Sequence, residues 1–161
     1  MAIQVGDRVP SGSLNHMTAD GPAQITTDEL FKGKKVVIFA LPGAFTPTCS
    51  AKHVPGFVQH ADAIKAKGVD TIACLSVNDA FVMGAWSKDQ GVGDKLLMLA
   101  DGAAAYTAAL GMELDLTDLG MGVRSKRYAM VVDDGKVTVL AEEPNPAALE
   151  VASAEAIVAA L

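Results

Sequence analysis

Cys49 is the residue of this sequence best placed to do chemistry. It ends a run that contains Pro42, Thr46 and Pro47, in the segment Leu-Pro-Gly-Ala-Phe-Thr-Pro-Thr-Cys-Ser at residues 41–50. The segment lies between an apolar run typical of a buried strand and an amphipathic pattern typical of a helix, and ligands bind beyond the carboxyl ends of such strands. We therefore expect Cys49 at or just inside a helix start, where unpaired N–H groups and the helix dipole favour an anion such as a thiolate.

The residues before Cys49 suit a reactive thiolate. Thr46 lies one helical turn earlier, so its hydroxyl can point at the sulfur and orient a hydroxylic substrate. Pro42 can cover the sulfur and limit the access of water, and the backbone N–H groups of Thr48 and Cys49 can point at a bound oxygen. A lone cysteine in such a place is more often a small buried apolar residue. The functional interpretation therefore depends on the flanking Pro, Thr and Pro.

A cation to accompany the thiolate is expected in the most basic stretch of the chain, Gly-Val-Arg-Ser-Lys-Arg at residues 122–127. An arginine close to a thiolate stabilises it and polarises a substrate oxygen. Because side chains alternate along a strand, spacing alone does not place both Arg124 and Arg127. Lys126 is better interpreted as a solvated charge at a strand start.

Composition limits the class of protein. The chain has 161 residues, of which 50% are apolar and 20% charged, which predicts one globular domain over residues 1–161. The net charge of −6 and the lack of a long basic run argue against nucleic-acid binding. No apolar stretch is long enough to cross a membrane, and the first residues lack a signal pattern, so we expect a cytoplasmic protein. Two cysteines and three scattered histidines predict neither a disulfide scaffold nor a metal site.

The pattern of apolar residues predicts an α/β fold. Residues 1–30 are expected to form loops and short extended pieces, with Thr26 and Glu29 in capping-box spacing. Buried strands are predicted at 35–41, 71–77 and 95–100, and a hairpin at 128–132 and 136–140. Helices are predicted at 50–67 with a kink at Pro55, after Asn78-Asp79 as far as Trp86, at 103–110, and after Ser153. This order favours a central mixed sheet with helices on both faces, and a thioredoxin-like fold by analogy.

Several stretches of the sequence are distinctive in combination: Pro-Gly-Ala-Phe-Thr-Pro-Thr-Cys at 42–49, Lys-His-Val-Pro-Gly-Phe at 52–57, Cys-Leu-Ser-Val-Asn-Asp at 74–79, and Gly-Val-Arg-Ser-Lys-Arg-Tyr at 122–128. They resemble the peroxiredoxins, and more narrowly their type II (also called type 5) subfamily, over about residues 4–145. The resemblance implies a thioredoxin-like thiol peroxidase that reduces hydrogen peroxide and alkyl hydroperoxides. It also implies that no metal, flavin or haem takes part.

The resemblance assigns roles by position. It makes Cys49 the peroxidatic cysteine, which becomes a sulfenic acid, and Pro42 the residue that shields its sulfur. It makes Arg127 the catalytic arginine, and Arg124 then a nearby supporting charge at most. It makes Thr46 the residue whose hydroxyl contacts the peroxide. Thr48 and Gly43 are further candidates for substrate binding.

The route back to the thiol is less defined. Some members of the subfamily carry a resolving cysteine near the C-terminus, but residues 143–161 contain none. Cys74 matches the second cysteine of members with the plant-type pattern, but its place within an apolar run favours a buried structural thiol over a resolving one. We therefore expect an external reductant, either glutathione with glutaredoxin or thioredoxin. The resemblance also implies a homodimer, with Phe45 and the helix after Asn78 as candidate contacts.

Two other functions compete with the peroxidase. A thioredoxin-like redox sensor or holdase would use oxidation of Cys49 to change a contact with a partner, without turnover. A cysteine hydrolase would need His53 or His60 as a base. We interpret His53, four residues after Cys49, as a surface or interface histidine rather than as a base.

Overall fold

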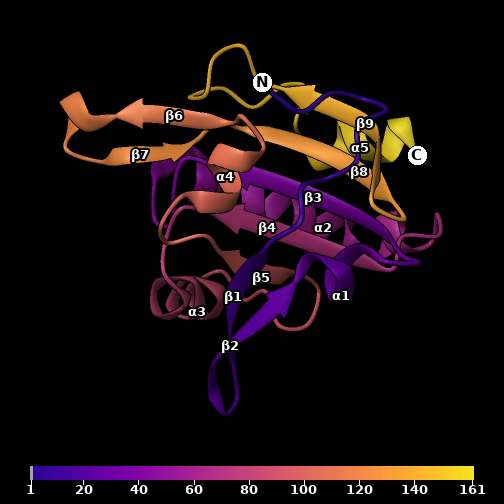
Figure 1. Ribbon diagram of the computed structural model, residues 1–161, viewed down its shortest axis with the longest axis horizontal. Helices are drawn as coiled ribbons and strands as arrows, with labels where there is room; N and C mark the ends of the chain where they lie inside the picture. Colours follow the sequence, from indigo (N-terminus) through magenta and orange to yellow (C-terminus); the bar gives the residue numbers. More distant parts are fainter. Residues whose placement is uncertain (1) are drawn as a thin grey trace.

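A seven-stranded mixed sheet forms the centre of the computed structural model, which describes residues 2–161 (Figure 1). Its strand order is β2-β1-β5-β4-β3-β8-β9, with β3, β4 and β5 parallel to one another and β8 antiparallel to β3. The strands are β1 (Ser13–Thr18), β2 (Gly21–Thr26), β3 (Lys35–Leu41), β4 (Thr71–Ser76), β5 (Leu97–Ala100), β8 (Tyr128–Asp133) and β9 (Lys136–Glu142).

Helices cover both faces of this sheet, as the sequence predicted. One face packs against α2 (Val54–Lys65), α3 (Ala80–Asp89) and α5 (Ala154–Ala160). The other packs against α1 (Thr27–Phe31) and α4 (Ala105–Ala109). The strand β3 lies between these layers and six of its seven residues are buried, which explains its unbroken apolar sequence.

The predicted capping residues are confirmed at two helices, and at a third one of the two predicted residues is the cap. Thr26 and Glu29 form the predicted capping box at α1, and Ser153 caps α5. At α3 the capping side chain is Asp79, which accepts the N–H of Val82; Asn78 has another role, described below.

Two strand pairs were not predicted. Residues 13–26 form the β1–β2 hairpin instead of loops and short extended pieces, and a separate two-stranded sheet pairs β6 (Glu113–Leu116) with β7 (Gly122–Ser125) through the 3-10 turn η2 (Thr117–Leu119). Each pair buries few side chains, so the apolar alternation that marks a strand is weak. Figure 1 shows β6 and β7 projecting beyond the end of the main sheet.

The segment after Cys49 also differs from the predicted helix. Residues Cys49–His53 form a π-helical turn, η1, in which the N–H of Val54 donates to the carbonyl of Cys49, and α2 follows directly. Pro55 lies just after this π turn, in the first two positions of α2, so the irregularity predicted near the proline takes the form of a π turn. In residues 2–161, no helix has the length and apolar character needed to cross a membrane.

Candidate active site

Cys49 and Arg127 meet inside the protein. The Arg127 guanidinium donates from Nη2 to the Cys49 sulfur at 3.1 Å. Cys49 is fully buried at the start of η1, and Arg127, which enters from the turn before β8, is 2% exposed. With little water between them, the guanidinium stabilises negative charge on the sulfur more strongly than it would at the surface. Of the two arginines that spacing could not separate, Arg127 reaches the thiol.

His53 holds Arg127 in this position. Its Nδ1 lies 2.8 Å from Arg127 Nη1, and its Nε2 lies 2.9 Å from the carbonyl oxygen of Ala152. A carbonyl only accepts, so Nε2 carries the ring proton and Nδ1 accepts from the guanidinium. Burial, and then the charge of Arg127, lower the pKa of His53 to about 3, so the ring is neutral at physiological pH.

The interpretation of His53 as a surface or interface residue was therefore wrong. The side chain is fully buried, and its ring packs 4.9 Å from that of Phe39 and 5.6 Å from that of Phe57, measured between centroids. A polar ring is tolerated there because both of its nitrogens have partners. Its Nδ1 is engaged by Arg127 rather than by Cys49.

A buried carboxylate organises the loop that receives Arg127 and His53. One oxygen of Glu143, Oε2, accepts the backbone N–H groups of Glu150, Val151 and Ala152 at 2.8, 2.7 and 2.7 Å. This holds the Ala152 carbonyl in place for His53. In the same loop, the carbonyl of Pro146 accepts a hydrogen bond from Arg127 Nε at 2.8 Å. Sequence reasoning missed Glu143, since an acidic residue after a strand is usually solvated.

The loop after β3 carries the predicted substrate contacts. The Thr46 hydroxyl donates to the carbonyl oxygen of Gly43 at 2.7 Å, which fixes its proton and leaves its lone pairs free to accept. The Thr48 hydroxyl donates to the carbonyl of Ala147 at 3.0 Å. The Pro42 carbonyl accepts from Arg124 Nη1 at 3.2 Å.

Asn78 fixes the same loop from the β4 side. Its Oδ1 accepts the N–H of Ala44 at 3.0 Å and the Ser76 hydroxyl at 2.6 Å. Phe45, the residue after Ala44, adopts a left-handed backbone conformation with φ of 63° and is 54% exposed. Such a conformation persists in a non-glycine residue only where the surroundings enforce it. The sequence analysis assigned Asn78 to the cap of the following helix together with Asp79, and therefore missed its contact with the loop.

Cys74 is buried on β4, as predicted. Burial, and then the proximity of Cys49, raise the pKa of the Cys74 thiol well above its usual value, so it stays protonated at neutral pH. Neither cysteine is in a disulfide. Lys126 lies at the surface 3.9 Å from Glu142, which agrees with its interpretation as a solvated charge.

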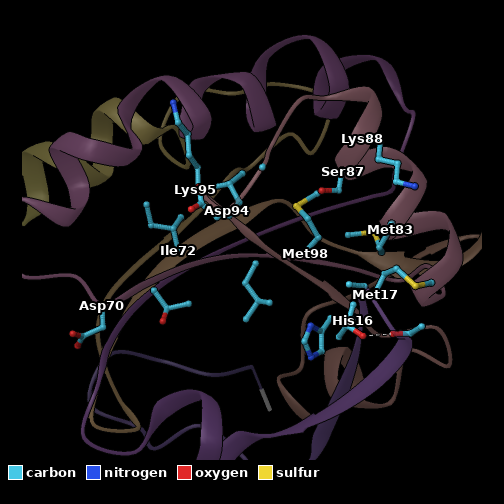
Figure 2. A pocket seen from close by; sticks show the side chains of 18 of the residues that line it. His16, Met17, Asp70, Ile72, Met83, Ser87, Lys88, Asp94, Lys95 and Met98 are labelled. Carbon is cyan, nitrogen blue, oxygen red and sulfur yellow. Dashed lines mark hydrogen bonds between the residues drawn. The ribbon is translucent and has the colours of Figure 1, made fainter.

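A large pocket lies away from this site. It has a volume of about 770 Å³ between β1, β5 and α3, and its lining includes Met17, Met83 and Met98 (Figure 2). Cys49 and Arg127 do not line it. Within residues 2–161, no three His, Cys, Asp or Glu side chains come together in a way that could hold a metal ion.

Fold and site together define a thioredoxin-like protein with a thiol-based redox centre. The Redoxin family model matches residues 4–158. Peroxiredoxin-2B of Arabidopsis thaliana is 49% identical over 99% of this chain and 98% of its own length. Chloroplastic Peroxiredoxin-2E of the same plant is 52% identical over 86% of this chain, and the match spans 61% of that relative. The chain belongs to the peroxiredoxin family, and its activity is that of a thiol-dependent peroxidase.

Solved structures agree with this assignment. Reduced Prx3 from Vibrio vulnificus in complex with H2O2 is 52% identical, with a TM-score of 0.93 over 98% of both chains. Peroxiredoxin 5 from Alvinella pompejana is 35% identical, with a TM-score of 0.85 over 98% of this chain and 96% of the other. These similarities confirm the predicted fold class and the type II (type 5) resemblance.

Proposed function

We propose that Cys49 is the peroxidatic residue and that it reduces hydrogen peroxide and alkyl hydroperoxides. The observation that carries the proposal is the 3.1 Å contact of its buried sulfur with the Arg127 guanidinium. The thiolate attacks one peroxide oxygen, so an S–O bond forms and the O–O bond breaks. The leaving hydroxide or alkoxide takes a proton to become water or an alcohol, and Cys49 becomes a sulfenic acid.

The surrounding groups act on the charge that develops in this step. Negative charge moves from sulfur to the leaving oxygen, and the Arg127 guanidinium can follow it. The Thr46 hydroxyl, whose proton is committed to Gly43, is free to accept from the O–H of the peroxide. The backbone N–H of Thr48 and that of Cys49 lie at the helix start and can donate to a bound oxygen. Pro42 limits the access of water.

An external thiol best explains recycling. The sequence contains only Cys49 and Cys74, and a buried thiol that stays protonated is a poor attacker of a sulfenic acid. We infer that glutathione with glutaredoxin, or thioredoxin, condenses with the sulfenic acid to a mixed disulfide and water. A second thiol then releases Cys49 and forms the disulfide of the reductant.

The decisive experiment follows loss of hydrogen peroxide with dithiothreitol as reductant, for the parent chain and for Cys49→Ser. We expect many turnovers for the parent and none for the variant. Unchanged turnover in Cys49→Ser would eliminate the proposal. Consumption of one equivalent without further turnover would favour the redox sensor or holdase instead.

The reductant is tested by intact-mass measurement after one equivalent of peroxide in the presence of glutathione. A glutathione adduct on Cys49 supports external resolution. A loss of two hydrogens with no adduct would indicate a Cys49–Cys74 disulfide.

We also infer a homodimer and a cytoplasmic location. Phe45 and Phe81, in the loop before Cys49 and on α3, are 54% and 68% exposed, which suits an apolar contact with a second copy. Sedimentation of Phe81→Glu against the parent tests the dimer, which we expect to dissociate in the variant. Cell fractionation tests the location.

A further inference from the structure

Arg124 lies close to the candidate active site without touching Cys49. It belongs to β7 and is half-buried, and its Nε donates to the carbonyl of Met121 at 3.0 Å. Its Nη1 donates to the carbonyl of Pro42 at 3.2 Å, across 82 positions of sequence. Two hydrogen bonds from one planar fork fix both the position and the direction of the guanidinium.

The lack of a side chain at Gly43 leaves room for this guanidinium. A Cβ built on Gly43 would collide with Arg124 Nη1, and its next neighbour would be the Thr46 methyl at 3.5 Å. Gly43 is not among the glycines with positive φ, so a side chain here would act through Arg124 rather than through backbone strain: it would push the guanidinium out of its position.

The contact leads to Thr46 through a single residue. The carbonyl of Gly43 accepts both the Thr46 hydroxyl at 2.7 Å and the Thr46 N–H at 3.4 Å. Arg124 therefore braces the Pro42–Gly43 peptide, and the next peptide, Gly43–Ala44, carries the carbonyl that sets the direction of the Thr46 hydroxyl. Asn78, which follows β4, accepts the N–H of Ala44 at 3.0 Å, so the loop is held at two points.

We propose that Arg124 is a positioning residue of the peroxidase, which clamps the Pro42–Gly43 backbone and thereby aims the Thr46 hydroxyl at the bound peroxide. The inference rests on the proposed function. Phe45, with its φ of 63°, makes the clamp necessary because a strained loop relaxes when its anchors are removed. Displacing a substrate-orienting group by about 1 Å can cost on the order of 100-fold in rate.

The test compares two reactions of the same sulfur in Arg124→Ala. Oxidation by hydrogen peroxide requires the Thr46 hydroxyl, whereas alkylation by iodoacetamide requires only the thiolate. Both are followed in single turnovers of the reduced chain, with the fluorescence of Trp86 as reporter, since its Nε1 donates to Ser50 next to Cys49. We expect the peroxide rate constant to fall about 10- to 100-fold and alkylation to change less than about twofold.

Lys126→Ala is the matched control. It removes a positive charge two positions along the same stretch, from a side chain that pairs with Glu142 at the surface, and we expect both rates to be retained. Arg124→Lys keeps the charge but not the fork and is expected to lose most of the same peroxide rate. It serves as the test variant if circular dichroism shows that Arg124→Ala is unfolded.

A double-mutant cycle with Gly43→Ala separates the clamp from a general loss of structure. Gly43→Ala is expected to slow peroxide oxidation in the parent but to add nothing in Arg124→Ala, where the colliding guanidinium is absent. Additive losses, equal losses in both reactions, or a parental peroxide rate in Arg124→Ala would each overturn the inference. A parent chain without Cys49-dependent peroxide turnover would instead refute the proposed function, and the clamp with it.

Discussion

Replacing His53 by Leu removes the acceptor that holds Arg127 against Cys49. In the parent, Arg127 Nη1 donates to His53 Nδ1 at 2.8 Å, while Nη2 of the same guanidinium donates to the sulfur at 3.1 Å. Leucine keeps apolar contacts with Phe39 and Phe57 but offers no lone pair. The guanidinium then loses one of the three groups that fix its plane.

The size of the effect follows from the bond that is lost. A hydrogen bond that involves a charged group contributes about 1.5–3 kcal/mol. If the loss of this bond raises the activation free energy by the same amount, oxidation of Cys49 slows by roughly 10- to 150-fold, since about 1.4 kcal/mol corresponds to a factor of ten. The carbonyl of Ala152 also loses its partner, so we expect the free energy of unfolding to fall by about 1–3 kcal/mol.

The assay is the second-order rate constant for oxidation of the reduced chain by hydrogen peroxide, at a temperature where circular dichroism shows every variant folded. His53→Asn is the rescue variant, because its amide oxygen can lie near the former Nδ1, and we expect it to recover part of the rate. In Arg127→Gln the His53→Leu change should add little, since its only route to the sulfur is gone. A parental rate in His53→Leu, or fully additive losses, would refute this reasoning.

Three further predictions concern stability and recycling. Because the folded pKa of His53, about 3, lies below its unfolded value of 6.5, the unfolded chain binds the extra proton and stability falls as the pH drops below 6.5. Urea titrations should show about 2 kcal/mol lost between pH 7 and pH 5 through this group, a component that His53→Asn lacks. Cys74→Ser should retain peroxide turnover with external thiols in the coupled assay; loss of turnover would make Cys74 a resolving residue. Glu143→Ala should lower the unfolding free energy by about 1–3 kcal/mol, because three backbone N–H groups lose their acceptor and one of them, that of Ala152, is buried. Lys126→Gln should change it by less than about 1 kcal/mol, and equal effects would contradict the role of the buried carboxylate.

The sequence predicted those parts of the fold that are encoded locally. The apolar run at 35–41 became β3 with the same bounds, and the capping residues Thr26 and Ser153 started the helices they were expected to start. The chemistry around Cys49 was also local, because the thiol, the threonine and the loop lie within eight residues of one another. Short-range patterns of this kind need no knowledge of the tertiary structure.

The supporting groups could not be predicted because their partners are distant in sequence. His53 meets Arg127 across 74 positions and Ala152 across 99, and only these contacts make burial of its ring possible. Asn78 is separated from Ala44 by 34 positions. A polar residue with a remote partner has the same local signature as a solvated one.

The environment of Arg127 supports the proposal that Cys49 carries the reactivity. A buried guanidinium is costly unless a negative group accompanies it. Among the described residues, no carboxylate forms an ion pair with Arg127: its other partners are a backbone carbonyl and the neutral ring of His53. The sulfur of Cys49 is therefore the one partner that can carry a full negative charge. One oxygen of Glu143 accepts three backbone N–H groups and the carboxylate forms no ion pair with Arg127, so in the proposed reaction the charge of Arg127 is left to act on the thiolate and then on the leaving oxygen.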